Sequence, residues 1–356
     1  MSSVASPVVA LKNLSLSELC EHVKMLGEPT YRVSQLVKWV YQKRLDSFGG
    51  MANIPKKSRA LFEQKFSLKK LTLAYCMESR RKDAVKFGFK TVNGDAVIES
   101  VLLYDRDRRT ACVSSQLGCG LGCAFCATGA MGLIRNLSQE EIIGQLIGMS
   151  DYCAVKSDKD ITNVVFMGMG EALSNFDAFM SSLKILMLED AFFIGARRIT
   201  VSTAGVIPSI ERLMDQNLTI GLAISLNAFN NAQRDRIMPI NKKYPIESLV
   251  AIARRYEGKT GRPVTFEYVV IAGENDTAEA VSALVNLLGG FPCKINVIPL
   301  NPGAQVSAAA PGEKRLQEFT AALVSRGLNA IVRTSRGRDI SGACGQLSGK
   351  MHNELR

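Results

Sequence analysis

The chain has 356 residues, 47% of them apolar, and a net charge of +11. No apolar stretch approaches the roughly 20 residues that a membrane-spanning helix needs, so the composition predicts a globular protein of one large domain or two unequal ones. Residues 1–11 lack a basic start followed by an apolar run, so we expect no secretory signal and a cytoplasmic protein that makes no membrane contact.

Basic residues are unevenly distributed along the chain. Eleven Lys or Arg lie between Lys56 and Lys90, against three acids. Such a block favours a polyanion partner, in particular nucleic acid, although charge alone predicts a solvated basic face about equally well. The nine cysteines, in a reducing cytosol, indicate metal binding or catalysis more than structural disulfides.

The N-terminal part is predicted to be helical. Ser15 can cap a helix over Leu16–Met25, and apolar residues at helical spacing predict a second helix over Tyr31–Phe48. A third helix is predicted over Lys57–Phe66. These three helices would form a small basic domain.

Strand and helix patterns alternate in the rest of the chain. Asn93-Gly94 is a strong hairpin signal between strands over Val85–Thr91 and Ala96–Leu103. Further strands are predicted over Ala111–Ser115, Asn163–Met167, Arg198–Ser202, Ile220–Leu226, Thr265–Ile271, Lys294–Pro299 and Ala330–Arg333. Helices are predicted over Gln139–Tyr152, Ala178–Leu188, Ile207–Asp215, Ile246–Tyr256, Ala278–Leu288 and Glu313–Ser325. Ser138 and Glu141 form a capping box for the first of these helices.

The alternation defines the fold class. Repeated strand–helix units imply a parallel sheet, and about six of them fit an incomplete β/α barrel better than a flat doubly wound sheet. The predicted class is therefore α/β, an incomplete (β/α)6 barrel with a small N-terminal helical domain. We place the helical domain, with the start of the hairpin, at residues 1–92, and the barrel with a C-terminal segment carrying Cys344 at residues 93–356.

Three cysteines follow the first predicted barrel strand, where the chemistry of such barrels gathers. Cys119, Cys123 and Cys126 have the spacing Cys-x3-Cys-x2-Cys, with no histidine nearby. Three thiolates on one loop can hold a four-iron, four-sulfur cluster with one iron open to a small molecule. Structural zinc is the alternative, but its fourth ligand would have to come from far away in the sequence. The spacing therefore predicts a [4Fe–4S] cluster and a redox enzyme.

These residues also carry a family resemblance. The cysteine spacing, with Phe125 before the last cysteine, resembles the radical S-adenosylmethionine (SAM) superfamily. Longer motifs resemble the RlmN/Cfr family of RNA adenine methyltransferases: Cys112-Val-Ser-Ser-Gln-Leu-Gly-Cys119, Gly168-Met-Gly-Glu171, Leu222-Ala-Ile-Ser-Leu226, Met238-Pro-Ile-Asn-Lys-Lys243, Pro292-Cys-Lys-Ile-Asn296 and Ala343-Cys-Gly-Gln-Leu347. The run from Tyr31 to Trp39 and Ile54-Pro-Lys56 resemble that family's helical RNA-binding domain.

The resemblance implies a set of SAM contacts. Gly170 and Glu171 belong to it, at a strand end where glycine lets the backbone approach a ligand. Ser202, Ser225, Leu226, Asn227 and Asn301 match further contacts. Without the resemblance, each of these would be interpreted as a cap or turn residue. Two positions depart from the family: Ala172 replaces the usual proline, and Asn227 replaces a histidine and cannot be cationic.

Three further residues match catalytic positions of the family. Cys344 matches its methyl-carrying cysteine and Cys112 the resolving partner, although a lone cysteine is otherwise most often a small buried hydrophobe. Glu99 matches the proton acceptor. It lies on the second hairpin strand, on the same face as Val97 and Val101, and burial there would raise its pKa as a general base needs. An exposed charge on an edge strand is the alternative.

The resemblance implies the reaction as well. One SAM would methylate Cys344, and a second would be cleaved reductively at the cluster to generate the radical that activates this methyl group. Methylation of adenosine C2 in 23S rRNA, in the peptidyl-transferase region, would end with a Cys112–Cys344 disulfide. The adenosine following the anticodon in tRNA is a second substrate of the common branch. The implied electron donor is a protein such as flavodoxin, and we expect a monomer.

Two alternatives remain open at this point. The Cfr-like branch methylates C8 of adenosine in 23S rRNA and confers antibiotic resistance. A non-catalytic, metal-bearing RNA-binding protein is the alternative from another functional class.

Overall fold

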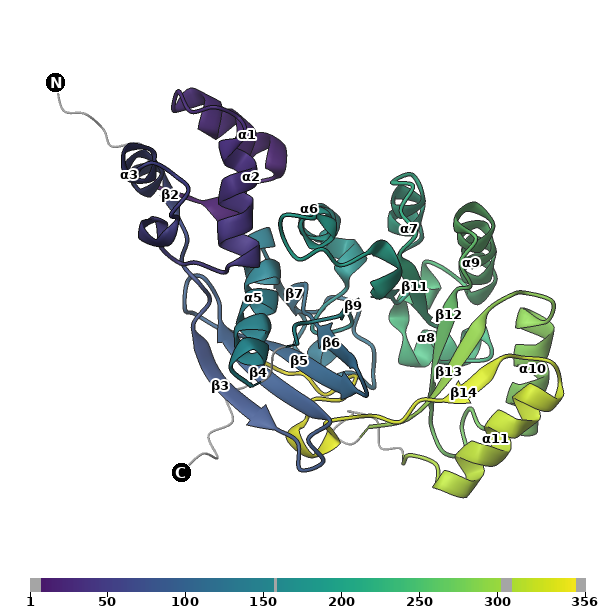
Figure 1. Ribbon diagram of the computed structural model, residues 1–356. Helices are drawn as coiled ribbons and strands as arrows, with labels where there is room; N and C mark the ends of the chain where they lie inside the picture. Colours follow the sequence, from purple (N-terminus) through teal and green to yellow (C-terminus); the bar gives the residue numbers. More distant parts are fainter. Residues whose placement is uncertain (1–7, 157–158, 302–308, 350–356) are drawn as a thin grey trace.

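The computed structural model describes residues 8–156, 159–301 and 309–349, and a ten-stranded sheet organises this part of the chain (Figure 1). The strand order is β14-β13-β12-β11-β10-β9-β6-β5-β4-β3. These strands are β3 (Leu73–Glu78), β4 (Ala84–Lys90), β5 (Val97–Asp105), β6 (Arg108–Cys112), β9 (Asn163–Phe166), β10 (Ile199–Thr203), β11 (Gly221–Ser225), β12 (Thr265–Val270), β13 (Lys294–Pro299) and β14 (Ala330–Val332). From β6 to β14 neighbours are parallel, whereas β3 to β6 pair antiparallel.

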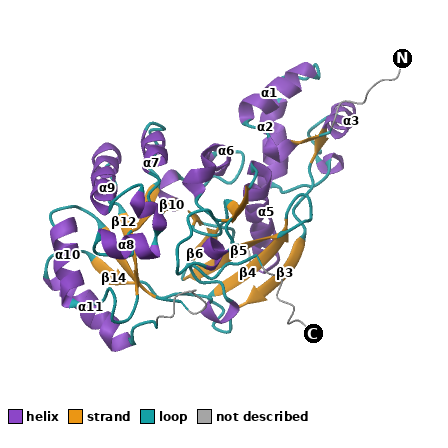
Figure 2. Ribbon diagram, turned by 180° about the vertical axis from the view of Figure 1, so that it is seen from behind, coloured by secondary structure: helices purple, strands orange, loops and turns teal. Residues whose placement is uncertain are grey.

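Helices on the outer side of the curved sheet connect the parallel strands (Figures 1 and 2). They are α5 (Gln139–Lys156), α6 (Phe176–Met187), α7 (Ile207–Met214), α9 (Ile246–Thr260), α10 (Ala278–Leu288) and α11 (Glu313–Ser325). Strands β14 and β3 are the two edges of the sheet, so the barrel stays open. The predicted incomplete barrel of six strand–helix units is confirmed, and β14 adds a parallel strand after the sixth unit.

The side chains of β12 point alternately to the hydrophobic core and to a cavity on the inner face of the sheet. Phe266 and Tyr268 are fully buried, and the Tyr268 ring stacks on Phe319 of α11 with centroids 5.8 Å apart. Successive side chains of a strand point to opposite faces. Glu267 and Val269, between and after these rings, line a cavity on the inner face instead. The apolar outer face thus binds the helices, while the inner face carries polar side chains.

The N-terminal region packs beside α5 (Figure 1). It contains α1 (Leu16–Met25), α2 (Arg32–Val37), the π-helical η2 (Lys38–Gln42), the 3-10 helices η1 (Leu11–Asn13) and η3 (Phe48–Gly50), α3 (Lys56–Lys65) and the short parallel pair β1 (Val9–Ala10) and β2 (Phe66–Ser67). Ser15 and Glu18 form a capping box at the start of α1, as the sequence predicts for a Ser15 cap. Gln139 Nε2 of α5 donates to the Lys12 carbonyl at 2.8 Å, which ties the two regions together.

The helix predicted over Tyr31–Phe48 is wrong beyond Gln42. Arg44 adopts a positive φ of 55°, which a continuing helix does not allow. Its guanidinium instead pairs with Asp151 of α5 at 3.0 Å and with Asp160 at 2.8 Å. Tertiary ion pairs thus override the local helical pattern.

The hairpin prediction at Asn93-Gly94 is confirmed, since β4 and β5 pair across this turn. The predicted helices Leu16–Met25, Ala278–Leu288 and Glu313–Ser325 also match the observed bounds. The first barrel strand starts and ends three residues earlier than predicted, at Arg108 and Cys112. In the described residues, none of the helices has the length and apolar character needed to cross a bilayer.

Candidate active site

A short hairpin carries the loop with the three cysteines. Strands β7 (Gln116–Gly118) and β8 (Leu133–Asn136) flank the loop and pair antiparallel. Gly118 has a φ of +74°, and a Cβ there would lie 1.9 Å from the Gly132 carbonyl oxygen. Only glycine fits this close approach. The Cys119 N–H donates to the same Gly132 oxygen at 2.9 Å, so the turn fixes where the first cysteine begins.

Backbone hydrogen bonds tie the loop to distant parts of the chain. The Ala124 N–H donates to the Ile237 carbonyl, at the end of α8 (Asn231–Ile237), over 2.9 Å. The Ala127 N–H, at the start of α4 (Ala127–Ala130), donates to the Gly345 carbonyl over 2.7 Å. The loop therefore lies between the segment after β11 and the segment after β14.

The three thiols face a cavity of about 160 Å³, here called the inner cavity. Its lining brings together most of the residues that the sequence predicts for the cluster and for SAM: Cys119, Cys123, Cys126, Gly170, Glu171, Ser202, Ser225, Asn227 and Asn301. Leu226 is absent from this lining, because its side chain is fully buried in the core. Its backbone N–H donates to the Glu267 carbonyl at 3.0 Å, so any ligand contact of Leu226 would have to come from the backbone.

The donor set of the loop fits an iron–sulfur cluster. In the described residues, no three His, Cys, Asp or Glu side chains are arranged to hold a single metal ion. The loop thiols still influence one another, because burial and the neighbouring sulfurs of Cys126 and Cys119 raise the pKa of Cys123 well above its ordinary value. Ligands to separate irons need not close around one point, as four zinc ligands must. Three thiols on one loop, all lining one cavity, are the ligand set that a cluster with one open iron would take.

Glu171 is held rigidly at the edge of the inner cavity. Its carboxylate accepts from the Ala204 N–H at 2.8 Å and from the Leu173 N–H at 3.2 Å. Burial nevertheless raises its pKa to about 7. Gly170 before it has a φ of +92°, and a Cβ there would lie 2.4 Å from Gln116 Cβ. Glycine is therefore required to bring this carboxylate to the cavity.

Asn301 offers an unused acceptor to the inner cavity. Its Nδ2 donates to the Cys344 carbonyl at 3.0 Å, while its buried Oδ1 has no hydrogen-bond partner among the described residues. Buried polar atoms are normally paired, so this oxygen indicates a missing ligand donor. SAM carries such donors on its amino and hydroxyl groups, and the residues present fit it.

Asn227 has a different position from Asn301. It adopts a φ of +58°, which asparagine tolerates better than most residues. Its Oδ1 accepts from the Val269 N–H at 2.9 Å, and its Nδ2 lies 3.3 Å from the Met238 sulfur. Both ends of the side chain thus bind protein, although the residue lines the cavity. Ser202 on β10 and Ser225 at the end of β11 are half-buried in the same lining.

A second cavity of about 360 Å³ adjoins the first and is called the thiol cavity here. It is lined by both Cys112, the last residue of β6, and Cys344, in the loop after β14. Both are free thiols. Burial and the nearby Cys344 raise the pKa of Cys112 to about 12. The structure thus brings together two cysteines whose proximity the sequence could not show.

Arg333 lies between the two cavities and lines both. Its Nη1 is 3.3 Å from Glu267 Oε2, and the negative charge of the Cys344 thiolate, helped by Glu267, raises its pKa above the ordinary value. This cation lies in the same cavity lining as Cys344 and Cys112. The sequence marks Arg333 only as part of an arginine-rich stretch.

Arg234 on α8 is a second residue that sequence reasoning missed. It is fully buried and donates to the carbonyls of Leu226, Ala204 and Ser225 at 3.1, 2.7 and 3.0 Å. These bonds fix the loops at the ends of β10 and β11. No local signal distinguishes this arginine from an exposed one on a short helix.

Glu99 is fully buried at the centre of an ionic and hydrogen-bonded group. Lys86 Nζ lies 2.6 Å from its Oε1, and the Tyr75 hydroxyl donates to the same oxygen. The N–H groups of Ser348 and Gly349 donate to Oε2 at 2.7 and 3.1 Å. The alternative of an exposed edge-strand charge is wrong, because β5 is an interior strand of the sheet. Glu99 is not among the residues that line the thiol cavity.

Comparisons with known proteins agree with this geometry. The sequence model of the Radical SAM superfamily matches residues 113–285, and that of the ribosomal RNA large subunit methyltransferase N-terminal domain matches residues 9–68. The chain is 41% identical over 344 residues to the dual-specificity RNA methyltransferase RlmN of Geobacter sulfurreducens, covering 97% of this chain and 93% of that protein. For the RlmN of Geotalea uraniireducens the identity is 39% over 348 residues, with 98% and 99% covered.

The fold has a solved counterpart. A radical SAM methyltransferase from Sphaerobacter thermophilus matches with a TM-score of 0.91 and 43% identity, over 96% of this chain and 100% of that one. An open parallel barrel with a three-cysteine loop after its first strand is the architecture of the radical SAM superfamily. Within that superfamily, the chain belongs to the RlmN family of SAM-dependent RNA methyltransferases. Membership implies a [4Fe–4S] cluster and SAM as its cofactors.

Proposed function

We propose that this chain methylates C2 of an adenosine in the peptidyl-transferase region of 23S rRNA and of the adenosine 3′ of the anticodon in tRNA. The relatives are named dual-specificity RNA methyltransferases, which supports two RNA substrates. One observation carries the proposal. Cys112 and Cys344 share the thiol cavity, and this cavity adjoins the cavity of the three-cysteine loop.

An adenine ring carbon that bears hydrogen is a poor nucleophile, so simple displacement on SAM cannot methylate it. When bound by Cys119, Cys123 and Cys126, a cluster with an open iron supplies the electron that activates SAM. Glu171, Ser202, Ser225, Asn227 and Asn301, the glycine backbone at Gly170 and the Leu226 backbone would position SAM. Two SAM molecules are consumed per turnover, one as methyl donor and one as radical source.

Cys344 carries the methyl group. Its sulfur would take this group from the first SAM by displacement at the methyl carbon, with S-adenosylhomocysteine as the leaving group. A hydrogen atom of this methyl group would pass to the radical that the second SAM supplies, and the resulting carbon radical on Cys344 adds to adenine C2 and joins protein and RNA. The adduct gives up one electron, which the oxidised cluster would take back. Glu99 accepts the ring proton. Because Ser348 and Gly349 cover its carboxylate, this step requires the C-terminal segment to move.

Cys112 completes the cycle. Its sulfur attacks Cys344, which releases the methylated RNA and leaves a disulfide between the two cysteines. A reductant must reopen that disulfide before the next turnover. In this proposal the helical domain of residues 1–92 contacts structured RNA, a protein such as flavodoxin delivers electrons, and the enzyme acts as a monomer.

An anaerobic methylation assay tests the proposal. The reconstituted protein is incubated with SAM, a reductant and either a 23S rRNA fragment or tRNA, and nucleosides are separated by mass spectrometry. We expect 2-methyladenosine from both RNAs. Methylation only at C8 would assign the chain to the Cfr-like reaction and contradict the proposal.

A further inference from the structure

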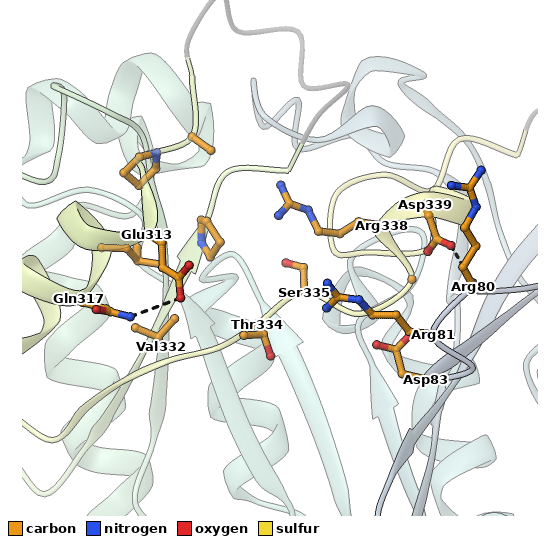
Figure 3. A pocket seen from close by; sticks show the side chains of 15 residues that line it. Arg80, Arg81, Asp83, Glu313, Gln317, Val332, Thr334, Ser335, Arg338 and Asp339 are labelled. Carbon is orange, nitrogen blue, oxygen red and sulfur yellow. Dashed lines mark hydrogen bonds between the residues drawn. The ribbon is translucent and has the colours of Figure 1, made fainter.

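A groove of about 830 Å³ opens beside the thiol cavity (Figure 3). One wall consists of the β3–β4 turn, with Arg80 and Arg81, and of the segment after β14, with Arg338. The start of α11 and the end of β14 form the other wall. Two basic stretches far apart in sequence, the block of residues 56–90 and the arginine-rich residues after β14, therefore meet in this groove.

The three arginines are available to a ligand. All three are exposed, and in the part of the chain that the structure describes no carboxylate pairs with their guanidinium groups. Figure 3 shows Arg81 and Arg338 extending from their wall into the groove, with the Ser335 hydroxyl between them.

The neighbouring acids are already engaged. Asp339 Oδ2 accepts from the Arg80 backbone N–H at 2.8 Å, and Asp83 Oδ1 accepts from the Ser79 hydroxyl at 2.8 Å. Glu313, on the opposite wall, accepts from Gln317 Nε2 at 3.4 Å (Figure 3). These carboxylates stabilise the two turns and the helix start, and the guanidinium groups keep their charge for another partner.

The groove is continuous with the site of methyl transfer. Val332, Thr334 and Ser335 line both the groove and the thiol cavity that contains Cys112 and Cys344. A chain-like ligand lying in the groove can therefore insert one of its units next to the two thiols. A volume of about 830 Å³ is near the upper end of the roughly 300–1,000 Å³ usual for ligand sites, so the groove has room for more than one base.

We infer that this groove binds the ribose–phosphate backbone of the RNA next to the target adenosine, with Arg80, Arg81 and Arg338 on its phosphates. The inference rests on the proposed function and assigns the RNA path that this function needs. Arginine binds phosphate oxygens with paired N–H groups, and such backbone contacts position RNA without reading its sequence. Enzymes that act on a base take it out of the stack, and the adjoining thiol cavity would receive that base.

An acidic electron-carrier protein is a less suitable occupant. A specific protein interface covers about 800 Å² per partner, mostly across an open surface. Here the cations line a recessed groove that leads to the thiols. Single-stranded RNA with an unstacked base fits such a groove.

The test measures RNA binding by the full-length protein. The variants are Arg80→Ala/Arg81→Ala and Arg338→Ala, with fluorescent tRNA as the probe. Arg197→Ala/Arg198→Ala is the matched control, because both arginines are exposed and precede β10, at the opposite end of the strands from the cysteine loop. It removes the same charge as the double variant.

We expect both groove variants to bind tRNA roughly tenfold or more weakly than the control variant. The slope of log Kd against log salt concentration should fall by about 0.7 for each phosphate that the variant no longer neutralises. Methylation of Cys344 by SAM without RNA should be unchanged, because Arg80, Arg81 and Arg338 do not line the thiol cavity.

Equal affinity and equal salt dependence in the groove and control variants would overturn the inference. So would normal RNA binding together with a turnover defect that appears only with a protein electron donor and not with a chemical reductant. Failure of the proposed function looks different, since the unaltered protein would then bind tRNA but yield no methyladenosine.

Discussion

Glu99 is a fully buried carboxylate that depends on one buried cation. The side chains of Lys86 and Glu99 are 1% and 0% exposed and lie 2.6 Å apart. Gly88, opposite Glu99 in the strand register, lets the Tyr75 ring pass over β4, because a Cβ there would lie 2.3 Å from that ring. The charge on Glu99 is therefore compensated and fixed by the sheet itself.

Removing the Lys86 cation should lower the stability of the fold. Lys86→Met leaves a buried carboxylate without its partner, and we expect the free energy of unfolding to fall by about 3–5 kcal/mol. Urea unfolding measures this change. Lys90→Met, at the exposed end of the same strand, should cost less than about 0.5 kcal/mol. If both variants were equally stable, the compensating role of Lys86 would be refuted.

The double variant Lys86→Met/Glu99→Gln should recover part of the stability lost in Lys86→Met, because the uncompensated charge is gone. Additive losses would indicate that the two side chains do not interact, contrary to the buried pair in the structure.

Substitutions of Cys344 and of Cys112 should block the proposed reaction at different steps. Cys344→Ala removes the methyl carrier, so methylation should drop below detection with no protein–RNA adduct. Cys112→Ala should still join Cys344 to RNA but not release it, so a covalent adduct should accumulate on a denaturing gel with labelled RNA. Repeated turnover by Cys112→Ala would show that Cys112 is not the resolving group.

At this scale the sequence was informative only where the signal is local. The spacing of Cys119, Cys123 and Cys126 within one loop predicts a metal site by itself. Lys86, Arg234 and Arg333 could not be found in this way, because a buried cation looks like an exposed one in a single sequence. Their roles come from packing between strands and loops that are distant along the chain.

Among the elements, the β7–β8 hairpin determines the position of the cysteine loop. Gly118→Ala would force a Cβ to 1.9 Å from the Gly132 oxygen, whereas a Cβ at Gly132 has nothing within 4 Å. Both glycines have positive φ, so Gly132→Ala should cost only the conformational penalty of about 1–2 kcal/mol.

We therefore expect Gly118→Ala to lose most of its iron and sulfide after anaerobic reconstitution, and Gly132→Ala to keep them. The measurement is metal and sulfide content per protein, with the melting temperature as a check on folding. Full cluster loading in Gly118→Ala would contradict the proposed role of this turn.

An ion pair between half-buried Arg135 and buried Glu141 joins the same hairpin to α5. Arg135 of β8 donates to both oxygens of Glu141 at 2.7 and 2.8 Å, and Glu141 also forms the predicted capping box with Ser138. Burial alone would raise the pKa of Glu141, but the bonds from Arg135, Ser138 and Val92 outweigh it and hold the pKa below the ordinary value.

The sign of the pH effect follows from this lowered pKa. Above the ordinary glutamate pKa of about 4.3, the ionised Glu141 side chain stabilises the fold. This contribution is lost as the pH falls through the lower pKa that Glu141 has in the folded protein. Glu141→Gln should therefore be less stable than the unaltered protein at pH 7, with a gap that narrows below about pH 4. Urea unfolding at several pH values measures the gap, and a constant gap would refute the assignment.

Element type was predictable where the pattern was long and regular. The apolar spacing of α10 and α11 and the Asn93-Gly94 turn gave bounds or pairings that the structure confirms. Strand β3 and the short pair β7–β8 were not predicted, because their pairing partners rather than their own residues define them. The prediction that the helix continues past Gln42 was wrong for a related reason, because Arg44 pairs with Asp151 and Asp160, which lie far away in the sequence.

At the scale of the whole molecule, the inner cavity, the thiol cavity and the groove adjoin one another in that order. The three loop thiols line the inner cavity, Cys112 and Cys344 line the thiol cavity, and Arg80, Arg81 and Arg338 line the groove. Neighbouring spaces share lining residues, with Arg333 between the first two and Ser335 between the last two. This continuity supports the proposed order from SAM to methyl carrier to RNA.

The central claim is that the methyl group reaches RNA through Cys344, and a label-transfer experiment tests it most directly. The protein is first incubated with SAM carrying a deuterated methyl group, freed of excess SAM, and then given tRNA, reductant and unlabelled SAM. We predict that the 2-methyladenosine of the first turnover contains deuterium, by mass spectrometry. A first product with only unlabelled methyl groups, from a protein whose Cys344 peptide carries the label, would contradict the account.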